Sequence, residues 1–244
     1  MSSSKVYDNL NFCFPVRELS NDRLKLTPFV PSLHASEFFK VASQSQGLYA
    51  HVSKGPWTSD QEYVDEFVQG TVQNDPGMVM FAIIDKTKPA TSYDPDGTLA
   101  GTITYMNSKA GHLSTEIGWV LVLPPFQRTH VTSNAVGLLL QYALDLPEQG
   151  GLALRRVEWQ TSTANVPSQR AAERMGFQKE GVVRWAMRFQ HGASKGKQGN
   201  GKEVPKGRGN GDDLGRDTVL YSLCWDDWEA GGREKIQAIM DRRA

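Results

Sequence analysis

The stretch that decides the fold is residues 116–144, EIGWVLVLPPFQRTHVTSNAVGLLLQYAL. It reads as an apolar strand of 114–123, a break at Pro124 and Pro125, a polar turn, and a helix of about 133–144. The first N–H groups of a helix have no partner within that helix, and the helix dipole favours an anion beside them. We therefore predict that residues 128–133, called the cradle below, bind an anion such as a phosphate.

Further strands and helices are predicted on both sides of this stretch. The pattern RLKLT at 23–27 alternates as a strand, Pro31 begins a helix that reaches about Ser43, and the run Thr58-Ser59-Asp60 caps a second helix. Additional strands are predicted at 78–84, 99–105, 155–160, 181–189 and 217–224, with a short helix at 167–175 and a terminal helix from Trp225. Strands that alternate with helices after an initial hairpin predict an α+β protein, or an α/β layer, with a mixed sheet.

The length of 244 residues favours one elaborated domain, at 23–244, after a polar lead-in at 1–22. The segment 190–215 is rich in glycine and lysine and has almost no large apolar side chains. Such a composition predicts a mobile loop, which serves either as a lid over a substrate or as filler at a hairpin tip.

Composition narrows the classes of function. Lys plus Arg and Asp plus Glu number 27 each, which disfavours nucleic acid as a partner. The 2 cysteines have neither metal-ligand spacing nor the density of a secreted disulfide scaffold, so we expect a reducing compartment and no metal. There is no run of about 18 apolar residues and no apolar leader, which predicts a cytoplasmic protein without a membrane partner.

The order of these motifs resembles the GNAT acyltransferases, and within them the Rim-like branch of ribosomal-protein alanine acetyltransferases. That branch shows an E-I-G strand, a Q-R-T turn, a T-E-A helix start and a later N-x-R-S-x-x-A-x-x-x-x-G-F segment. Over residues 23–228, these features are matched by Glu116-Ile117-Gly118, by Gln127 to Thr132, by Ser133-Asn134-Ala135, and by Asn165, Ser168, Ala172, Gly176 and Phe177. The resemblance implies the GNAT fold, with a central, mostly antiparallel sheet flanked by helices.

The resemblance also implies acetyl-CoA as co-substrate. In the family, the main chain of the central strand pairs with the pantetheine amides and the cradle N–H groups bind the diphosphate. These contacts fall here on Leu121, Val122, Leu123, Gln127, Arg128, Thr129, His130, Val131, Thr132 and Ser133. The family usually has glycine at the position of His130, and glycine or alanine at the position of Thr132. We therefore expect the His130 side chain to point to solvent and at most to touch a phosphate.

Two residues on the short helix match further family positions. Asn165 fits the residue that bonds the pantetheine arm, and Ser168 fits the residue beside the thioester sulfur. Both can also serve as caps of the helix that Pro167 begins. Ala172 stands where many relatives have a tyrosine acid, so Ser168 is the predicted proton donor to the CoA thiolate, with water as the alternative.

Glu116 is the predicted general base, directly or through a water, because it is the acid on the central strand near the cofactor. The alternative is that Glu116 pairs with a basic residue such as Arg184. Glu158, on the next strand, is the second candidate. For the acceptor, we expect walls from Trp57, Tyr63, Trp119, Arg184 and Trp185, although large aromatics more often belong to a core. Asp217, in an R-D pair, can anchor an acceptor cation or form an ordinary salt bridge.

We therefore expect an N-acetyltransferase that moves an acetyl group from acetyl-CoA to a primary amine of a small molecule or peptide N-terminus, by direct transfer in a ternary complex. No covalent enzyme intermediate is expected, because Cys13 and Cys224 lack a histidine partner in the motifs. The alternatives are a non-catalytic acyl-CoA-binding module of the same fold, and an O-acyltransferase or longer-acyl enzyme. The terminal helix, with apolar side chains such as Trp228 and Ile236, packs within the chain or in a homodimer.

Overall fold

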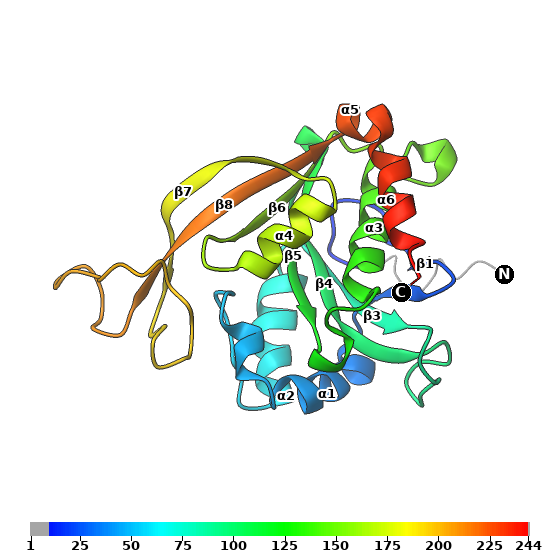
Figure 1. Cartoon of the computed structure of the whole chain (residues 1–244). Helices are drawn as coiled ribbons and strands as arrows, with labels where there is room; N and C mark the ends of the chain where they lie inside the picture. The colour runs from blue at the N-terminus through cyan, green and yellow to red at the C-terminus, as the bar shows by residue number, and fades with distance from the viewer. Residues whose placement is uncertain (1–9, 244) are drawn as a thin grey trace.

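One sheet organises the whole molecule (Figure 1), seen here in a computed structural model that describes residues 10–243. Its strands lie in the order β1-β2-β3-β4-β5-β6-β8-β7. The strands are β1 (Leu19–Ser20), β2 (Leu24–Pro28), β3 (Val79–Asp85), β4 (Thr98–Lys109), β5 (Ser114–Val122), β6 (Arg156–Ser162), β7 (Gln178–Phe189) and β8 (Leu214–Cys224). All neighbours pair antiparallel except β5 and β6. The predicted mixed, mostly antiparallel sheet is confirmed.

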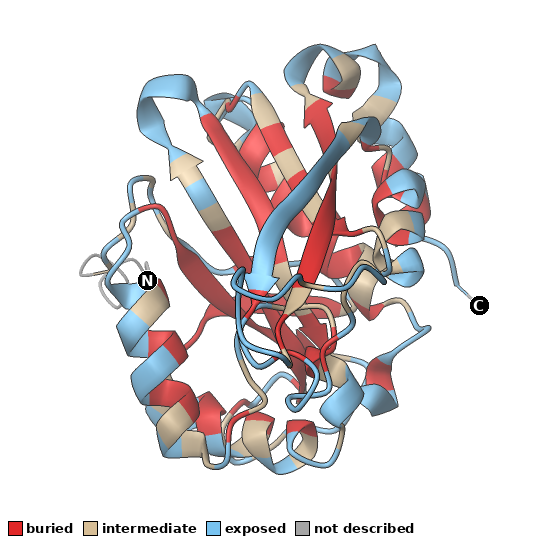
Figure 2. Ribbon diagram, turned by 90° about the vertical axis from the view of Figure 1, so that its left-hand side faces the viewer, coloured by how far each residue is buried: buried red, intermediate tan, exposed pale blue. Residues whose placement is uncertain are grey.

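Helical segments connect the strands and cover both faces of the sheet. They are α1 (Pro31–Ala42), η2 (Gln46–Tyr49), α2 (Asp60–Tyr63), η3 (Val64–Gln73), η4 (Ala110–His112), η5 (Pro124–Phe126), α3 (Val131–Leu144), η6 (Pro147–Gln149), α4 (Val166–Arg174), α5 (Trp225–Asp227), η7 (Trp228–Gly232) and α6 (Arg233–Met240). Figure 2 shows that the strands between these helices are buried along most of their length, while β7 stays exposed.

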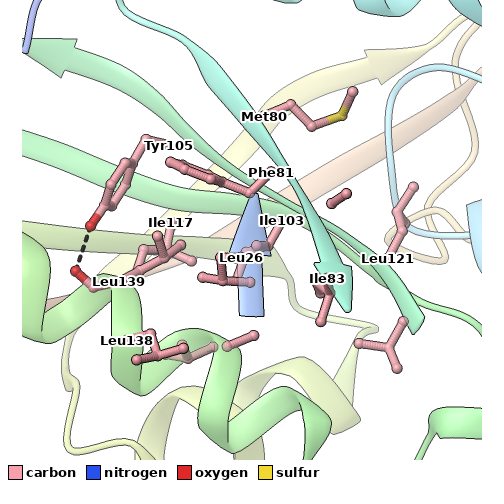
Figure 3. Packing of buried hydrophobic residues seen from close by; sticks show 14 of the residues in the cluster. Leu26, Met80, Phe81, Ile83, Ile103, Tyr105, Ile117, Leu121, Leu138 and Leu139 are labelled. Atoms are coloured by element: carbon pink, nitrogen blue, oxygen red, sulfur yellow. Dashed lines mark hydrogen bonds between the residues drawn. The ribbon is translucent and has the colours of Figure 1, made fainter. Parts of the chain in front are cut away.

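The core lies between the sheet and α3. Leu26, Ile103 and Ile117 come from three strands and meet Leu138 and Leu139 of the helix (Figure 3). The Tyr105 hydroxyl donates a hydrogen bond to the main-chain oxygen of Leu139, which fixes the helix on the sheet. This packing follows from alternation, because successive strand residues point to opposite faces. Burial of these aliphatic side chains is the main force that holds α3 in place.

The opposite face of the sheet is covered by α2 and η3. Met80 points to this side, where the Tyr63 hydroxyl lies 3.6 Å from its sulfur. Ser59 caps α2 as predicted, because its side chain accepts a hydrogen bond from the Glu62 N–H. The helix then widens into the π-helical η3, which the apolar spacing did not predict. The two faces therefore differ: aliphatic packing under α3, and aromatic rings under η3.

The described part of the lead-in packs on the domain. Phe12 and Phe14 contact the core cluster, and the Tyr142 hydroxyl donates to the main-chain oxygen of Pro15. Residues 1–9 of the predicted lead-in lie outside the described residues. Residues 10–22 thus belong spatially to the folded unit, although the sequence suggested only a polar lead-in there.

The terminal helix α6 lies against α3, which is the intramolecular alternative of the two predicted. Gly137 of α3 allows this close approach, since a Cβ there would lie 2.2 Å from the Met240 sulfur. Asp145, just after α3, accepts hydrogen bonds from Trp228 Nε1 at 2.9 Å and Arg233 Nε at 2.8 Å. The buried Asp145 carboxylate therefore ties the end of the chain to the core.

We predict that Asp145→Ala lowers the free energy of unfolding by about 2–3 kcal/mol, because it leaves the buried indole N–H of Trp228 without an acceptor. Urea unfolding followed by tryptophan fluorescence measures this. Glu229→Ala, at an exposed position of η7, is the matched control and is expected to change stability by less than about 0.5 kcal/mol. Equal effects of the two substitutions would contradict the tie.

Candidate active site

The site begins where two parallel strands separate. β5 pairs with β6 only from Ser114 to Glu116, opposite Arg156 to Glu158. Beyond this point β6 pairs only with β8, and β5 only with β4. Residues 117–122 therefore present one main-chain edge without a strand partner among the described residues, and an unpaired edge can pair with the amides of a ligand.

A β-bulge bends β5 beside this gap. The register between β4 and β5 shifts between Thr102 and Thr104, and Trp119 has a left-handed φ of 47°. A bulge puts two residues opposite one and turns the strand locally. Two of the main-chain groups predicted to meet acetyl-CoA are engaged nearby: the Val122 oxygen accepts from Gln127 Nε2 at 2.9 Å, and the Leu123 N–H donates to the Ala100 oxygen.

The cradle is present, and it overlaps the first turn of α3. The helix begins at Val131, two residues earlier than predicted, because the helical backbone already starts in the polar turn. Within residues 10–243, no group accepts a hydrogen bond from the main-chain N–H of Arg128, Thr129, His130, Thr132 or Ser133. Arg128 has φ +60°, and a left-handed residue next to helical ones forms a concave nest of N–H groups that suits an anion.

The seven residues 127–133 are predicted to contact acetyl-CoA. Two of them donate their main-chain N–H groups to acceptors within the chain. The Gln127 N–H donates to the Pro124 oxygen at 3.3 Å, and the Val131 N–H donates to Thr129 Oγ1 at 3.3 Å. These bonds shape the turn that exposes the other five. The contact of all seven residues with acetyl-CoA, and their role in binding it, stay predictions.

His130 does not point to solvent, so that expectation is wrong. Its side chain is 11% exposed, and Nε2 lies 3.2 Å from Asp85 Oδ1 in a charge contact without hydrogen-bond geometry. Asp85 is buried at the end of β3 and accepts from the Thr87 N–H and hydroxyl. The imidazole therefore lies beside a buried carboxylate and not in solvent.

Glu116 is a buried carboxyl group at the point where β5 and β6 part. The residue is 4% exposed, and Oε2 accepts a hydrogen bond from Asn107 Nδ2 at 2.7 Å. Burial raises its pKa from 4.5 to about 7; the Asn107 hydrogen bond lowers it, Glu158 raises it and Arg216 lowers it. Arg184 is exposed on β7, so the predicted alternative of a Glu116–Arg184 pair is not present.

Asn165 and Ser168 lie at the N-terminus of α4. The Asn165 side chain accepts from the Ser168 N–H at 3.2 Å, which is the helix cap that the sequence allowed. Ser168 Oγ accepts from Trp159 Nε1 at 3.0 Å. Because the indole uses one lone pair of the oxygen, the Ser168 hydroxyl keeps its own proton free to donate. The cap role is present for Asn165, and contact of either residue with acetyl-CoA stays a prediction.

The predicted aromatic walls fall into two groups. Trp57 is 5% exposed and packs against Tyr49, Tyr63 and Phe67. The Trp119 ring is half-buried and lies 4.3 Å from the Phe67 ring. Trp57 and Tyr63 are therefore part of the core beneath η3, whereas Trp119 lies at its border with the gap.

Trp185, Arg184 and Asp217 lie on the β7–β8 hairpin. Trp185 is 47% exposed, and Arg184 is exposed beside it. Asp217 accepts hydrogen bonds from the Trp185 N–H at 2.7 Å, Asn200 Nδ2 at 2.8 Å and Lys202 Nζ at 3.2 Å. The carboxylate that we expected to anchor an acceptor cation thus already holds Lys202, as the salt-bridge alternative had it.

The segment 190–215 is tied down, although its composition predicted a mobile loop. Lys197 is 7% exposed, and its Nζ donates to the main-chain oxygens of Tyr49 at 3.0 Å and Lys54 at 2.7 Å. The Gln198 N–H donates to the Ala50 oxygen. The loop is therefore attached to the segment between α1 and α2 by a buried lysine. Composition could not reveal this, since the acceptors are main-chain groups distant in sequence.

Sequence reasoning missed three side chains, on β8 and on the connection between α1 and α2, and one that contacts Glu116. Asn107 orients its carboxylate, and Arg216 and Thr218 of β8 and His51 of the α1–α2 connection carry buried polar atoms that form no hydrogen bond within residues 10–243. Only the R-D pair gave any signal, and it drew attention to Asp217 instead of Arg216. These residues come together through tertiary packing and have no shared motif.

The gap between β5 and β6, with a nest of free N–H groups beside it, is suited to an acyl-CoA transferase. A family model of the GNAT acetyltransferase domain matches residues 23–178, and the chain belongs to this family. It is therefore an acyltransferase with acetyl-CoA as co-substrate, as the motifs predicted. A search of curated proteins gave no significant match.

Solved structures agree with this fold. A GCN5-related N-acetyltransferase from Brucella melitensis is 26% identical with a TM-score of 0.69, covering 92% of this chain and 85% of that one. Mycobacterium smegmatis RimJ in complex with CoA-disulfide is 15% identical with a TM-score of 0.62, covering 91% and 93%. The microcin C7 self-immunity acetyltransferase MccE, in complex with acetyl-CoA and AMP, is 18% identical with a TM-score of 0.59, covering 84% and 93%. The last two are similar in fold alone.

No helix among residues 10–243 has both the length and the apolar character needed to span a bilayer.

We predict that Glu116→Gln stabilises the protein at pH 8 and not at pH 4. With a pKa raised from 4.5 to about 7, wild-type Glu116 loses up to about 3 kcal/mol of folding stability as the pH rises through this range, because a buried charge must form. A glutamine avoids this loss. Urea unfolding of both proteins between pH 4 and 8 measures the difference, and a constant difference would refute the burial of an ionising Glu116. Glu229→Gln, at an exposed position of η7, is the control.

Proposed function

We propose that the protein is an N-acetyltransferase that moves the acetyl group of acetyl-CoA to a primary amine of a small molecule or peptide N-terminus, by direct transfer in a ternary complex. The observation that carries this proposal is Glu116, a buried carboxyl group with a pKa raised to about 7, at the point where β5 leaves β6. An amine must lose a proton to attack a thioester, and a base that titrates near neutral pH suits that task.

Acetyl-CoA supplies an acyl group on a good thiolate leaving group. In our proposal the cradle N–H groups of Arg128, Thr129, His130, Thr132 and Ser133 hold the diphosphate, and the free edge of β5 at 117–122 pairs with the pantetheine arm. The fit is supported by five unpaired N–H groups around one turn. Such a set is costly to leave without partners unless water or a ligand satisfies it.

Two side chains move protons in this proposal. Glu116 accepts a proton from the amine, directly or through a water, while Asn107 holds its Oε2. As the amine nitrogen bonds to the acetyl carbon and the C–S bond breaks, Ser168 donates its hydroxyl proton to the departing thiolate and takes up a proton from water in return; Trp159 fixes its oxygen and leaves that proton free. No side-chain nucleophile is needed, so the cysteines take no part.

We predict that Ser133→Asp weakens acetyl-CoA binding at least tenfold, because a carboxylate placed in the cradle repels the diphosphate. An acidic residue in the first turn of a helix favours the helix itself, so the melting temperature of the free protein stays the same or rises. Isothermal titration calorimetry and thermal unfolding measure the two effects.

Ser133→Asn, which is similar in size to aspartate and uncharged, is the matched control for the cradle variant. It is expected to change the Kd of acetyl-CoA by less than about threefold. Equal affinity of the aspartate and asparagine variants would show that the diphosphate lies elsewhere.

We predict that Glu116→Gln lowers kcat/KM by about 10²- to 10⁴-fold with unchanged acetyl-CoA affinity, because it removes the general base. In wild type, kcat/KM should rise with pH through about 7 as Glu116 ionises. Thiol release with a panel of amines, between pH 5 and 9, measures both.

The Glu158→Gln variant distinguishes a shift in the pKa of Glu116 from the loss of the Glu116 carboxylate itself. Removal of the Glu158 charge, which raises the pKa of Glu116, should shift the midpoint of the pH profile to lower pH and keep the plateau. An unchanged profile for the Glu116→Gln variant would exclude Glu116 as the base. Binding of acetyl-CoA without thiol release from any amine would contradict the proposed transfer.

A further inference from the structure

Arg216 is a buried guanidinium group without an acidic partner. The residue is 7% exposed on β8. Its Nη1 donates to the main-chain oxygen of His51 at 3.4 Å, which is long for such a bond, and to the sulfur of Met187 at 3.5 Å, which is a weak acceptor. Nε is buried and donates no hydrogen bond to any described residue. A charge removed from water is costly unless it is paired, so this cation needs a partner that the protein does not supply.

The nearby carboxylates do not neutralise Arg216. Asp217, its neighbour in sequence, holds Asn200 and Lys202. Glu116 acts on Arg216 electrostatically but forms no ion pair with it, and its own burial favours the protonated form. The positive charge of Arg216 is therefore not offset by an ion pair among the described residues.

Two residues near Arg216 in the structure also carry unsatisfied buried polar atoms. Thr218 lies two residues further along β8, on the same face of the strand, and its buried Oγ1 forms no hydrogen bond among the described residues. His51, whose main-chain oxygen contacts Arg216, has a buried Nδ1 that also lacks a partner there. Buried polar groups are almost always hydrogen-bonded in folded proteins, so three adjacent exceptions indicate a polar ligand site.

We propose that Arg216 is a specificity-determining residue and that the acceptor is a small zwitterion, with a carboxylate that Arg216 binds and an amine that Glu116 deprotonates. This inference rests on the proposed N-acetyl transfer. The contacts within the described residues use only Nη1, so Nε and Nη2 are left without a hydrogen-bond acceptor. The edge formed by Nε and Nη2 offers two parallel donors, which match the two oxygens of a carboxylate. The cation and the buried acid then mirror the two charges of the acceptor.

A phosphate could use the same donors, but the charge at this site favours a carboxylate. A phosphate dianion needs more than one cation to offset its desolvation. Lys197 is the buried lysine of the neighbouring loop, and its ammonium group donates to the oxygens of Tyr49 and Lys54. Lys202 is bound to Asp217. One unpaired guanidinium group balances one negative charge.

The test compares matched pairs of amines that differ only in the acid. Glycine and glycinamide, alanine and alaninamide, and ω-amino acids of increasing length with their carboxamides serve as acceptors, with acetyl-CoA saturating and thiol release as the readout. The amides are the weaker bases and hold more free amine at neutral pH, so a preference for the acids cannot come from amine basicity. Wild type is expected to favour the acid in the best pair by roughly 100-fold in kcat/KM.

Arg216→Gln should raise KM for the preferred acid by roughly 100-fold, with kcat and the KM of its amide changed less than about threefold. Arg216→Lys, which keeps the charge without the fork, should restore part of the loss. Arg174→Gln, at an exposed position of α4, is the control and should leave both substrates unaffected. Because Arg216→Gln removes an unpaired buried charge, the melting temperature of the free protein should stay equal or rise, which shows that the variant folds.

Each outcome decides. Equal use of acids and amides by wild type, or an equal KM increase for both in Arg216→Gln, would overturn the inference. Preference for aminoethyl phosphate over every carboxylate would overturn the choice of carboxylate. The proposed transfer is tested separately, by measuring how much each acid raises the melting temperature with CoA present. Suppose that the acids stabilise wild type and not Arg216→Gln, while no amine gives thiol release. This result would support the role of Arg216 and refute the transfer.

Discussion

The arrangement of this protein depends on the parting of β5 from β6 after Glu116. The two strands share only three paired positions, and the bulge at Trp119 then turns β5 away. Strand edges inside a sheet are normally paired, so this gap is a place where a ligand replaces a strand. The cradle at the start of α3 follows β5 directly, and the cap of α4 follows β6. The two helix N-termini are therefore brought to the gap by chain connectivity, and Glu116, the base of the proposed transfer, lies at its closed end.

The two buried ionisable groups of the candidate site, Glu116 and Arg216, are kept apart. Glu116 is buried beside an amide donor, and Arg216 is buried beside a carbonyl group and a thioether, with no ion pair between the two. If they were in contact, each would hold the other charged, and neither would be available to a substrate. Because they do not form an ion pair, burial raises the pKa of Glu116 to about 7, and the guanidinium group of Arg216 has no acidic partner. The apolar core under α3 and η3 stabilises the fold and offsets the unfavourable free energy of burying these unsatisfied groups.

The sequence predicted the elements well where a local pattern specifies them. The strand of 114–123, the Ser59 cap and the helix at 166–174 are present within a residue or two, because alternation, capping and Pro-Gly breaks are local signals. The side chains around Glu116 were largely missed. Asn107 and Arg216 are separated by about a hundred residues and meet only through the order of the strands. His130 was misplaced for a similar reason, since Asp85, which attracts it, belongs to β3. Buried lysine bonds to main-chain oxygens, as for Lys197, leave no compositional trace.

The position of β8 between β6 and β7 has a consequence for how the enzyme is made. β7 is synthesised before β8 and has no place beside β6 until β8 has been inserted. Arg216 and Thr218 arrive with this late strand, and the residues that follow it lock against Asp145. In the proposed scheme, the acceptor side of the site is therefore completed only when β8 is inserted between β6 and β7, after the cradle and Glu116 are already present in the chain.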